Sequence, residues 1–114
     1  MKHEDRLQIA VMRYIKYQYG YALAIHPANE RKTSPIAGAV LKRKGVLRGV
    51  SDILIFNPNK THNGLAIELK VKPNKPTGEQ LAFLTKLRAE CNWMTAICYT
   101  FEEAQDIIDD YFEL

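Results

Sequence analysis

The pattern of apolar and polar positions predicts helices and strands along the whole chain. Apolar residues recur at helical spacing in some segments, whereas others are short apolar or alternating runs typical of strands. The order α-β-α-β-β-α-β-α predicts an α/β fold in which helices flank a mixed central sheet. The predicted helices are Glu4–Tyr19, Ile36–Lys44, Glu79–Glu90 and a last one that follows Thr100 to the C-terminus; the predicted strands are Tyr21–His26, Asp52–Phe56, Leu65–Val71 and Trp93–Tyr99.

Local signals mark the helix ends. Thr33 or Ser34 can cap the second helix, with Pro35 in its first turn. Thr77–Gln80 and Thr100–Glu103 fit the capping-box pattern. We find no internal repeat or linker, so we predict one domain over residues 1–114.

Composition and cysteine content narrow the class of protein to which this chain can belong. The 114 residues are 46% hydrophobic and 25% charged, which is ordinary for a globular domain. No apolar run approaches the roughly 18 residues that a membrane helix needs, so we expect no membrane partner. Two cysteines are too few for a disulfide framework, and we expect a soluble, cytoplasmic protein. Its core is modest, so a partner subunit would add stability.

The net charge of +3 is unevenly distributed. Residues 30–75 hold ten bases and three acids, a net charge of +7, whereas residues 101–114 hold six acids and no base, a net charge of −6. The middle of the chain is therefore the expected contact surface for a polyanion, although a solvated basic face would give the same pattern.

The predicted strand Leu65–Val71 carries the most informative residues. Alternation puts Leu65 and its alternate neighbours on the core face, and Glu68 and Lys70 together on the opposite face. If this strand pairs as a hairpin with the preceding one, Asp52 lies beside Glu68 and Lys70. Two carboxylates suit Mg²⁺, and a nearby lysine can orient an attacking water, so the set is suited to phosphodiester hydrolysis. A Glu–Lys pair on a solvated strand face is the simpler alternative.

The pattern of Asp52, a spacer and a strand with Glu68-x-Lys70 resembles the core motif of the PD-(D/E)XK nucleases. The surrounding sequence resembles the VRR-NUC branch of these nucleases, in particular its small standalone members. The resemblance covers nearly the whole chain. It departs at Ser51, where the family usually has proline, and at Asn92, near which it often has glycine. The matching segments are Glu4-x-x-x-Gln8, Pro27-Ala28-Asn29-Glu30, Ala39-x-Leu41-Lys42-x-x-Gly45-Val46, Gly49-Val50-Ser51-Asp52, Gly64-Leu65-x-Ile67-Glu68-x-Lys70, Gln80 and Glu103-Ala104…Tyr111-Phe112.

The resemblance implies a restriction-endonuclease-like core and a Mg²⁺- or Mn²⁺-dependent endonuclease. Asp52, Glu68 and the Leu69 backbone carbonyl would ligate the metal, and Lys70 would position the nucleophilic water. Glu4 would complete the metal shell, and Gln80 would stand beside the lysine. The family's standalone members imply a homodimer that cuts branched DNA such as four-way (Holliday) junctions.

Several alternatives stay open. Glu4 could be only a favourable first-turn charge, and Gln80 only the capping partner of Thr77. We read the three histidines as surface or loop residues, although His26 could approach the cleft. The rival functions are a catalytically weak or vestigial DNA-binding module, and a nuclease with a nicking, flap or duplex preference. The residues predicted to contact DNA are Asn29, Lys42, Arg43, Lys44, Arg48 and Lys72.

Overall fold

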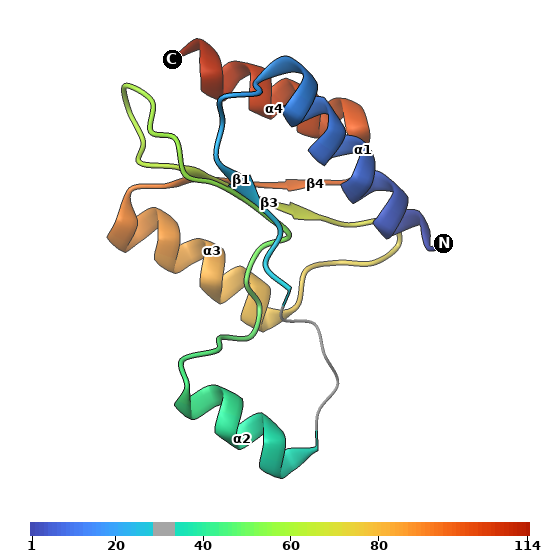
Figure 1. Ribbon diagram of the computed structural model, residues 1–114, viewed down its shortest axis with the longest axis vertical. Coiled ribbons are helices and arrows are strands. Elements are labelled where there is room, and N and C mark those ends of the chain that lie inside the picture. Colours follow the sequence, from blue (N-terminus) through green and yellow to red (C-terminus); the bar gives the residue numbers. More distant parts are fainter. Residues whose placement is uncertain (29–33) are drawn as a thin grey trace.

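The computed structural model describes residues 1–28 and 34–114. Its strands form one sheet in the order β1-β2-β3-β4 (Figure 1). The antiparallel part consists of β1 (Ala24–Ile25), β2 (Ile53–Ile55) and β3 (Leu65–Leu69), and β4 (Met94–Cys98) pairs parallel with β3. Parallel neighbours need a crossover, which α3 (Gly78–Cys91) supplies. The predicted mixed sheet and element order are confirmed.

Helices cover both faces of the sheet. In Figure 1, α1 (His3–Gln18) and α4 (Phe101–Glu113) lie side by side on one face, and α3 lies on the other. The hydroxyls of Tyr14 and Tyr19 both donate to Asp109 Oδ1, at 2.6 Å each, and so join α1 to α4. The main core lies beneath this helix pair and consists of Val11, Ile15, Ile53, Ile55, Leu65, Ile67, Leu69, Cys98, Ala104, Ile108 and Tyr111.

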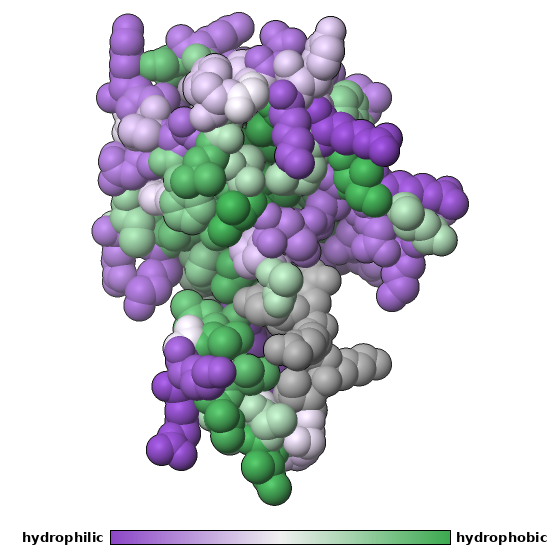
Figure 2. All heavy atoms as spheres, viewed as in Figure 1, coloured by the Kyte–Doolittle hydropathy of each residue, from purple (hydrophilic) through white to green (hydrophobic). Residues whose placement is uncertain are grey.

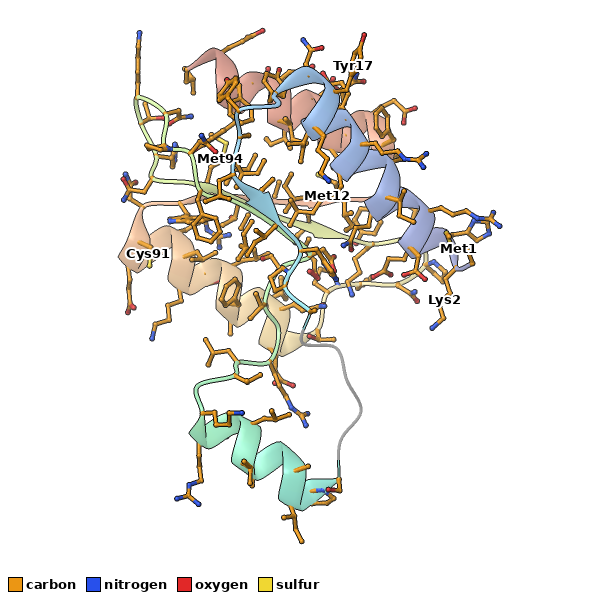
Figure 3. The ribbon with its side chains drawn as sticks, viewed as in Figure 1. Met1, Lys2, Met12, Tyr17, Cys91 and Met94 are labelled. Carbon is orange, nitrogen blue, oxygen red and sulfur yellow. The ribbon has the colours of Figure 1, made fainter. Side chains whose placement is uncertain are left out.

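Side chains around the core differ in how far they are buried. Met12 and Met94 are partly buried and pack against the core cluster, whereas Tyr17 and Cys91 are exposed at the periphery (Figure 3). No helix in the described residues is long and apolar enough to cross a membrane.

The predicted helix ends are largely confirmed. Ser34 caps α2 (Pro35–Arg43), and Thr77 and Gln80 form both bonds of a capping box. Thr100 caps α4, but the Glu103 carboxylate accepts from the Tyr99 N–H, so the reciprocal bond of the second box is displaced by one residue. Asn92 ends α3 in the left-handed conformation, with a φ of 56°.

All four strands are shorter than predicted. Only Ala24–Ile25 of the expected Tyr21–His26 strand is part of the ladder, although the Phe56 N–H also donates to the Leu23 carbonyl at 2.9 Å. The strand β3 ends at Leu69 instead of Val71, although the Lys70 N–H still donates to the Cys98 carbonyl at 3.0 Å.

The helix α2 stands apart from the layered body (Figure 1). None of its residues is buried, and apolar side chains gather on its visible face (Figure 2). Ile36, Val40 and the nearby Leu47 are 81%, 50% and 61% exposed. This helix is therefore amphipathic without a covering partner among the described residues.

Candidate metal centre and nucleic-acid interface

Asp52 and Glu68 meet at one end of the β2–β3 hairpin. The register pairs Ile53 with Ile67, so Asp52 and Glu68 occupy the next step outward. Asp52 Oδ2 accepts a hydrogen bond of 2.7 Å from the Leu69 N–H, which fixes this carboxylate against β3. The hairpin pairing predicted from the sequence is thereby confirmed.

This end of the sheet is buried, contrary to a solvated strand face. Asp52, Glu68 and Lys70 are 6%, 1% and 8% exposed. All five residues of β3 are buried, so both of its faces are covered. Because desolvating a charge is costly, a buried set of two carboxylates and one ammonium indicates a functional site more than a structural one.

The electrostatics of Glu68 follow from this setting. Burial, and then the neighbouring charge of Asp52, raise the pKa of Glu68 to about 8, although the charge of Lys70 opposes them. The ordinary value is 4.5. Without a cation, this carboxyl group therefore retains a proton at neutral pH.

The donor set fits a hard divalent cation. Both carboxylate oxygens of Glu68 are buried and have no hydrogen-bond partner among the described residues. Such orphaned acceptors are costly in a folded protein unless a ligand satisfies them. No group of three His, Cys, Asp or Glu side chains in these residues is arranged to hold a metal. Mg²⁺ is commonly held by one or two carboxylates together with water and phosphate oxygens, which suits Asp52 and Glu68.

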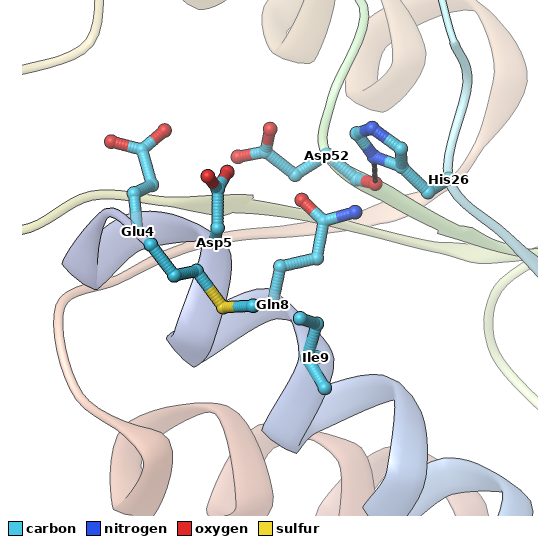
Figure 4. Close-up of a pocket in the computed structure, with 7 residues that line it drawn as sticks. Glu4, Asp5, Gln8, Ile9, His26 and Asp52 are labelled. Carbon is cyan, nitrogen blue, oxygen red and sulfur yellow. Dashed lines mark hydrogen bonds between the residues drawn. The ribbon is translucent and has the colours of Figure 1, made fainter.

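A cleft of about 320 Å³ opens beside Asp52 (Figure 4). The first turns of α1 supply Glu4, Asp5 and Gln8 to its wall, and His26 closes it from the end of β1. Glu4 and Asp52 thus line the same cleft, while the role of Glu4 as a ligand stays a prediction. The full lining is Met1, Glu4, Asp5, Gln8, Ile9, His26 and Asp52.

His26 is the site residue whose role sequence reasoning underestimated. Its Nδ1 lies 2.7 Å from the backbone oxygen of Asp52. The sequence signal was its position immediately before the segment that resembles the family loop, which begins at Pro27. A histidine in a loop has many roles, so only the tertiary contact distinguishes this one.

Gln80 is engaged in its helix cap. Its Oε1 accepts from the Thr77 N–H at 2.8 Å, and its own N–H donates to Thr77 Oγ1 at 3.2 Å. The backbone at Gly49 approaches this helix end so closely that an added Cβ would lie 2.5 Å from the carbonyl of Glu79. The start of α3 thus packs closely against the loop that leads to Asp52. A direct role of Gln80 in the site stays a prediction.

The predicted DNA-contacting bases are exposed. Lys42, Arg43, Lys44 and Arg48 belong to α2 or to the segment that follows it. Lys72 Nζ lies 6.0 Å from the centroid of the Tyr99 ring, at the end of the strands that carries Lys70. Asn29 lies outside the described residues. These bases are therefore accessible to a ligand, and their contacts with DNA stay predictions.

Comparisons with known proteins bear on the whole chain. No family model and no curated protein matches it. A solved structure named "VRR_NUC domain protein" is 25% identical, with a TM-score of 0.78 over 100% of this chain and 91% of that one. A second, named "VRR_NUC domain", is 18% identical with a TM-score of 0.60 over 97% and 99%, and it supports the fold alone. The full-length match at 25% identity supports the resemblance of this chain to the VRR-NUC family.

Proposed function

We propose that this chain is a Mg²⁺- or Mn²⁺-dependent endonuclease that hydrolyses phosphodiester bonds in structured DNA. The observation that carries the proposal is the buried Asp52–Glu68 pair, whose Glu68 oxygens have no protein partner among the described residues, next to the buried Lys70. The likeness to a solved VRR_NUC domain protein supports the same chemistry.

Asp52, Glu68 and the Leu69 carbonyl would hold the cation, with Glu4 approaching from α1. When bound, the cation supplies Lewis-acid stabilisation of the phosphoryl oxygens and a more acidic water. The Lys70 ammonium orients the attacking water and stabilises negative charge in the transition state. The exposed bases of α2 and Lys72 bind backbone phosphates, which positions DNA without reading its sequence.

The first test compares four-way junction, flap, duplex and single-stranded DNA, each with Mg²⁺ or Mn²⁺. We expect junction cleavage to be the fastest. Preferential cutting of flaps or nicking of duplex would contradict the proposed junction preference but still support nuclease activity. DNA binding without cleavage in either metal would favour the vestigial module.

Lys70→Met supplies the second test, because it removes the charge but retains most of the aliphatic length. We expect cleavage to fall by roughly 100- to 1000-fold while junction binding is retained. The matched control is Lys86→Met, since Lys86 is exposed and forms a surface ion pair with Glu90 at 3.6 Å. Equal cleavage by both variants would refute the role of Lys70.

We further propose a homodimer that covers the apolar face of α2. A nine-residue helix is marginal on its own in water, and Ile36 and Val40 are exposed on it. A second copy would also present two sites to the two strands of a symmetric junction. Solution mass should correspond to a dimer, and Ile36→Lys should shift it toward the monomer; a monomeric parent protein would overturn the proposal.

A further inference from the structure

We infer that His26 is a positioning residue that holds Asp52 in the geometry required for the metal site. This inference deepens the proposed function. The contact between His26 and Asp52 stands by itself, and only its role in metal binding rests on that function. Figure 4 shows the His26 ring beside Asp52, with its Nδ1 directed at the backbone oxygen of Asp52.

The identity of the acceptor determines the tautomer of His26. A carbonyl oxygen can only accept, so Nδ1 must carry the hydrogen that bridges the 2.7 Å. In the neutral ring, Nε2 is then an acceptor. The geometry therefore requires the Nδ1–H form.

Asp52 is consequently held at two separate points. His26, which follows β1, binds its backbone oxygen, and the Leu69 N–H of β3 binds its carboxylate at 2.7 Å. Asp52 itself immediately precedes β2 and lies outside the regular ladder, whose last pair is Ile53–Ile67. The β1–β2 register, continued past Ile25, puts Pro27 opposite Asp52, and proline has no N–H to donate, so the His26 ring supplies the donor instead.

Two anchors on one residue have a chemical consequence. A carboxylate that is correctly oriented before a cation arrives loses less conformational freedom on binding. Groups that orient metal ligands typically contribute about 10- to 100-fold to metal affinity or activity. Because His26 contacts the backbone of Asp52, it acts through that residue.

The first experiment needs no metal. Ring-nitrogen NMR at about pH 8, where an ordinary imidazole is neutral, should show the Nδ1–H tautomer of His26. Amide exchange of Leu69 then reports whether the Asp52 carboxylate stays in place, and we expect at least about tenfold faster exchange in His26→Ala. The Lys70 N–H, which bonds to Cys98 O instead, is the internal reference for general destabilisation.

Two replacements separate the ring nitrogens. The amide of Asn can donate from the place of Nδ1, whereas that of Gln reaches toward Nε2. We therefore expect His26→Asn, but not His26→Gln, to restore slow Leu69 exchange. His62→Asn is the matched control, because His62 lies in the connection between β2 and β3, at the opposite end of the hairpin.

The second experiment measures the dissociation constant of Mn²⁺ for the same four variants. We expect roughly tenfold weaker binding by His26→Ala and near-normal binding by His26→Asn. Rescue by Gln alone, the Nε2–H tautomer, or Leu69 exchange that His26→Ala leaves unchanged would overturn the inference. If the parent protein binds no Mn²⁺, the proposed metal dependence fails, while the exchange data still decide whether His26 positions Asp52.

Discussion

Asp52 and Glu68 occupy facing positions one step beyond the last Ile53–Ile67 pair of the β2–β3 hairpin. Their proximity and burial mean that the metal-free protein accommodates two acidic groups where solvent is nearly excluded. A protein whose site is used only structurally would replace one of them with an apolar residue, since unpaired buried charge is destabilising.

Glu68→Gln should stabilise the metal-free protein at alkaline pH. The pKa of Glu68 is raised from 4.5 to about 8, so the folded state binds the proton more tightly than the unfolded state. The stabilising contribution of this proton is fully present below 4.5 and is lost as the pH rises through about 8. Chemical denaturation in a chelator should show a loss on the order of 2–4 kcal/mol over this range, absent in the Gln variant.

The control for that experiment is Glu90→Gln, because Glu90 is exposed and forms a surface ion pair with Lys86. Such pairs contribute little, so the pH dependence should stay as in the parent protein. An unchanged pH dependence in Glu68→Gln would show that another group carries the proton.

Cation affinity should rise with pH. Because a ligating carboxylate must be deprotonated, Mn²⁺ competes with the proton on Glu68. We expect calorimetry to show affinity increasing by up to about tenfold per pH unit below about 8, with proton release. Glu68→Gln should abolish this pH dependence, because it removes the group that binds the competing proton. Saturating Mn²⁺ at 100 times its dissociation constant should stabilise the parent fold by about 2.7 kcal/mol. Binding that is independent of pH would place the cation away from Glu68.

Ser51→Ala should leave stability unchanged or raise it by up to about 1 kcal/mol. The hydroxyl of Ser51 is buried and has no hydrogen-bond partner among the described residues, so its removal relieves an unsatisfied group. Urea denaturation measures the change. The contrasting variant is Thr100→Ala, which removes the cap bond to the Glu103 N–H and should cost about 1 kcal/mol. A clear loss of stability in Ser51→Ala would reveal a partner for the hydroxyl.

Gly49→Ala should be considerably more disruptive than Gly45→Ala. Both glycines have positive φ, at 79° and 97°, so both substitutions introduce backbone strain of roughly 1 kcal/mol. Only at Gly49 would the new Cβ also meet backbone, 2.5 Å from Glu79, whereas nothing lies within 4 Å at Gly45. We expect a larger fall in unfolding free energy and reduced cleavage for Gly49→Ala alone. Equal effects would mean that the α3 contact adjusts freely.

Particular residues show how far sequence reasoning reaches. The capping box of Thr77 and Gln80 depends on local geometry alone, and it was predicted correctly. Leu81 and Leu84, three residues apart in α3, lie on the same face of the helix by spacing alone, yet Leu81 is 45% exposed while Leu84 is buried. Periodicity shows which residues share a face of a helix. How much of that face is buried depends on segments far apart in the sequence that pack against it.

The sequence by itself determined the order of elements and most of the helix caps, because these depend on periodicity and short-range hydrogen bonding. It brought Asp52 beside Glu68 only on the condition that their strands form a hairpin, which the structure confirms. Only the tertiary structure decided that the site is buried, that His26 contacts Asp52 and that α2 stands apart. These properties depend on how segments far apart in the chain cover one another, and no local pattern encodes that area of contact.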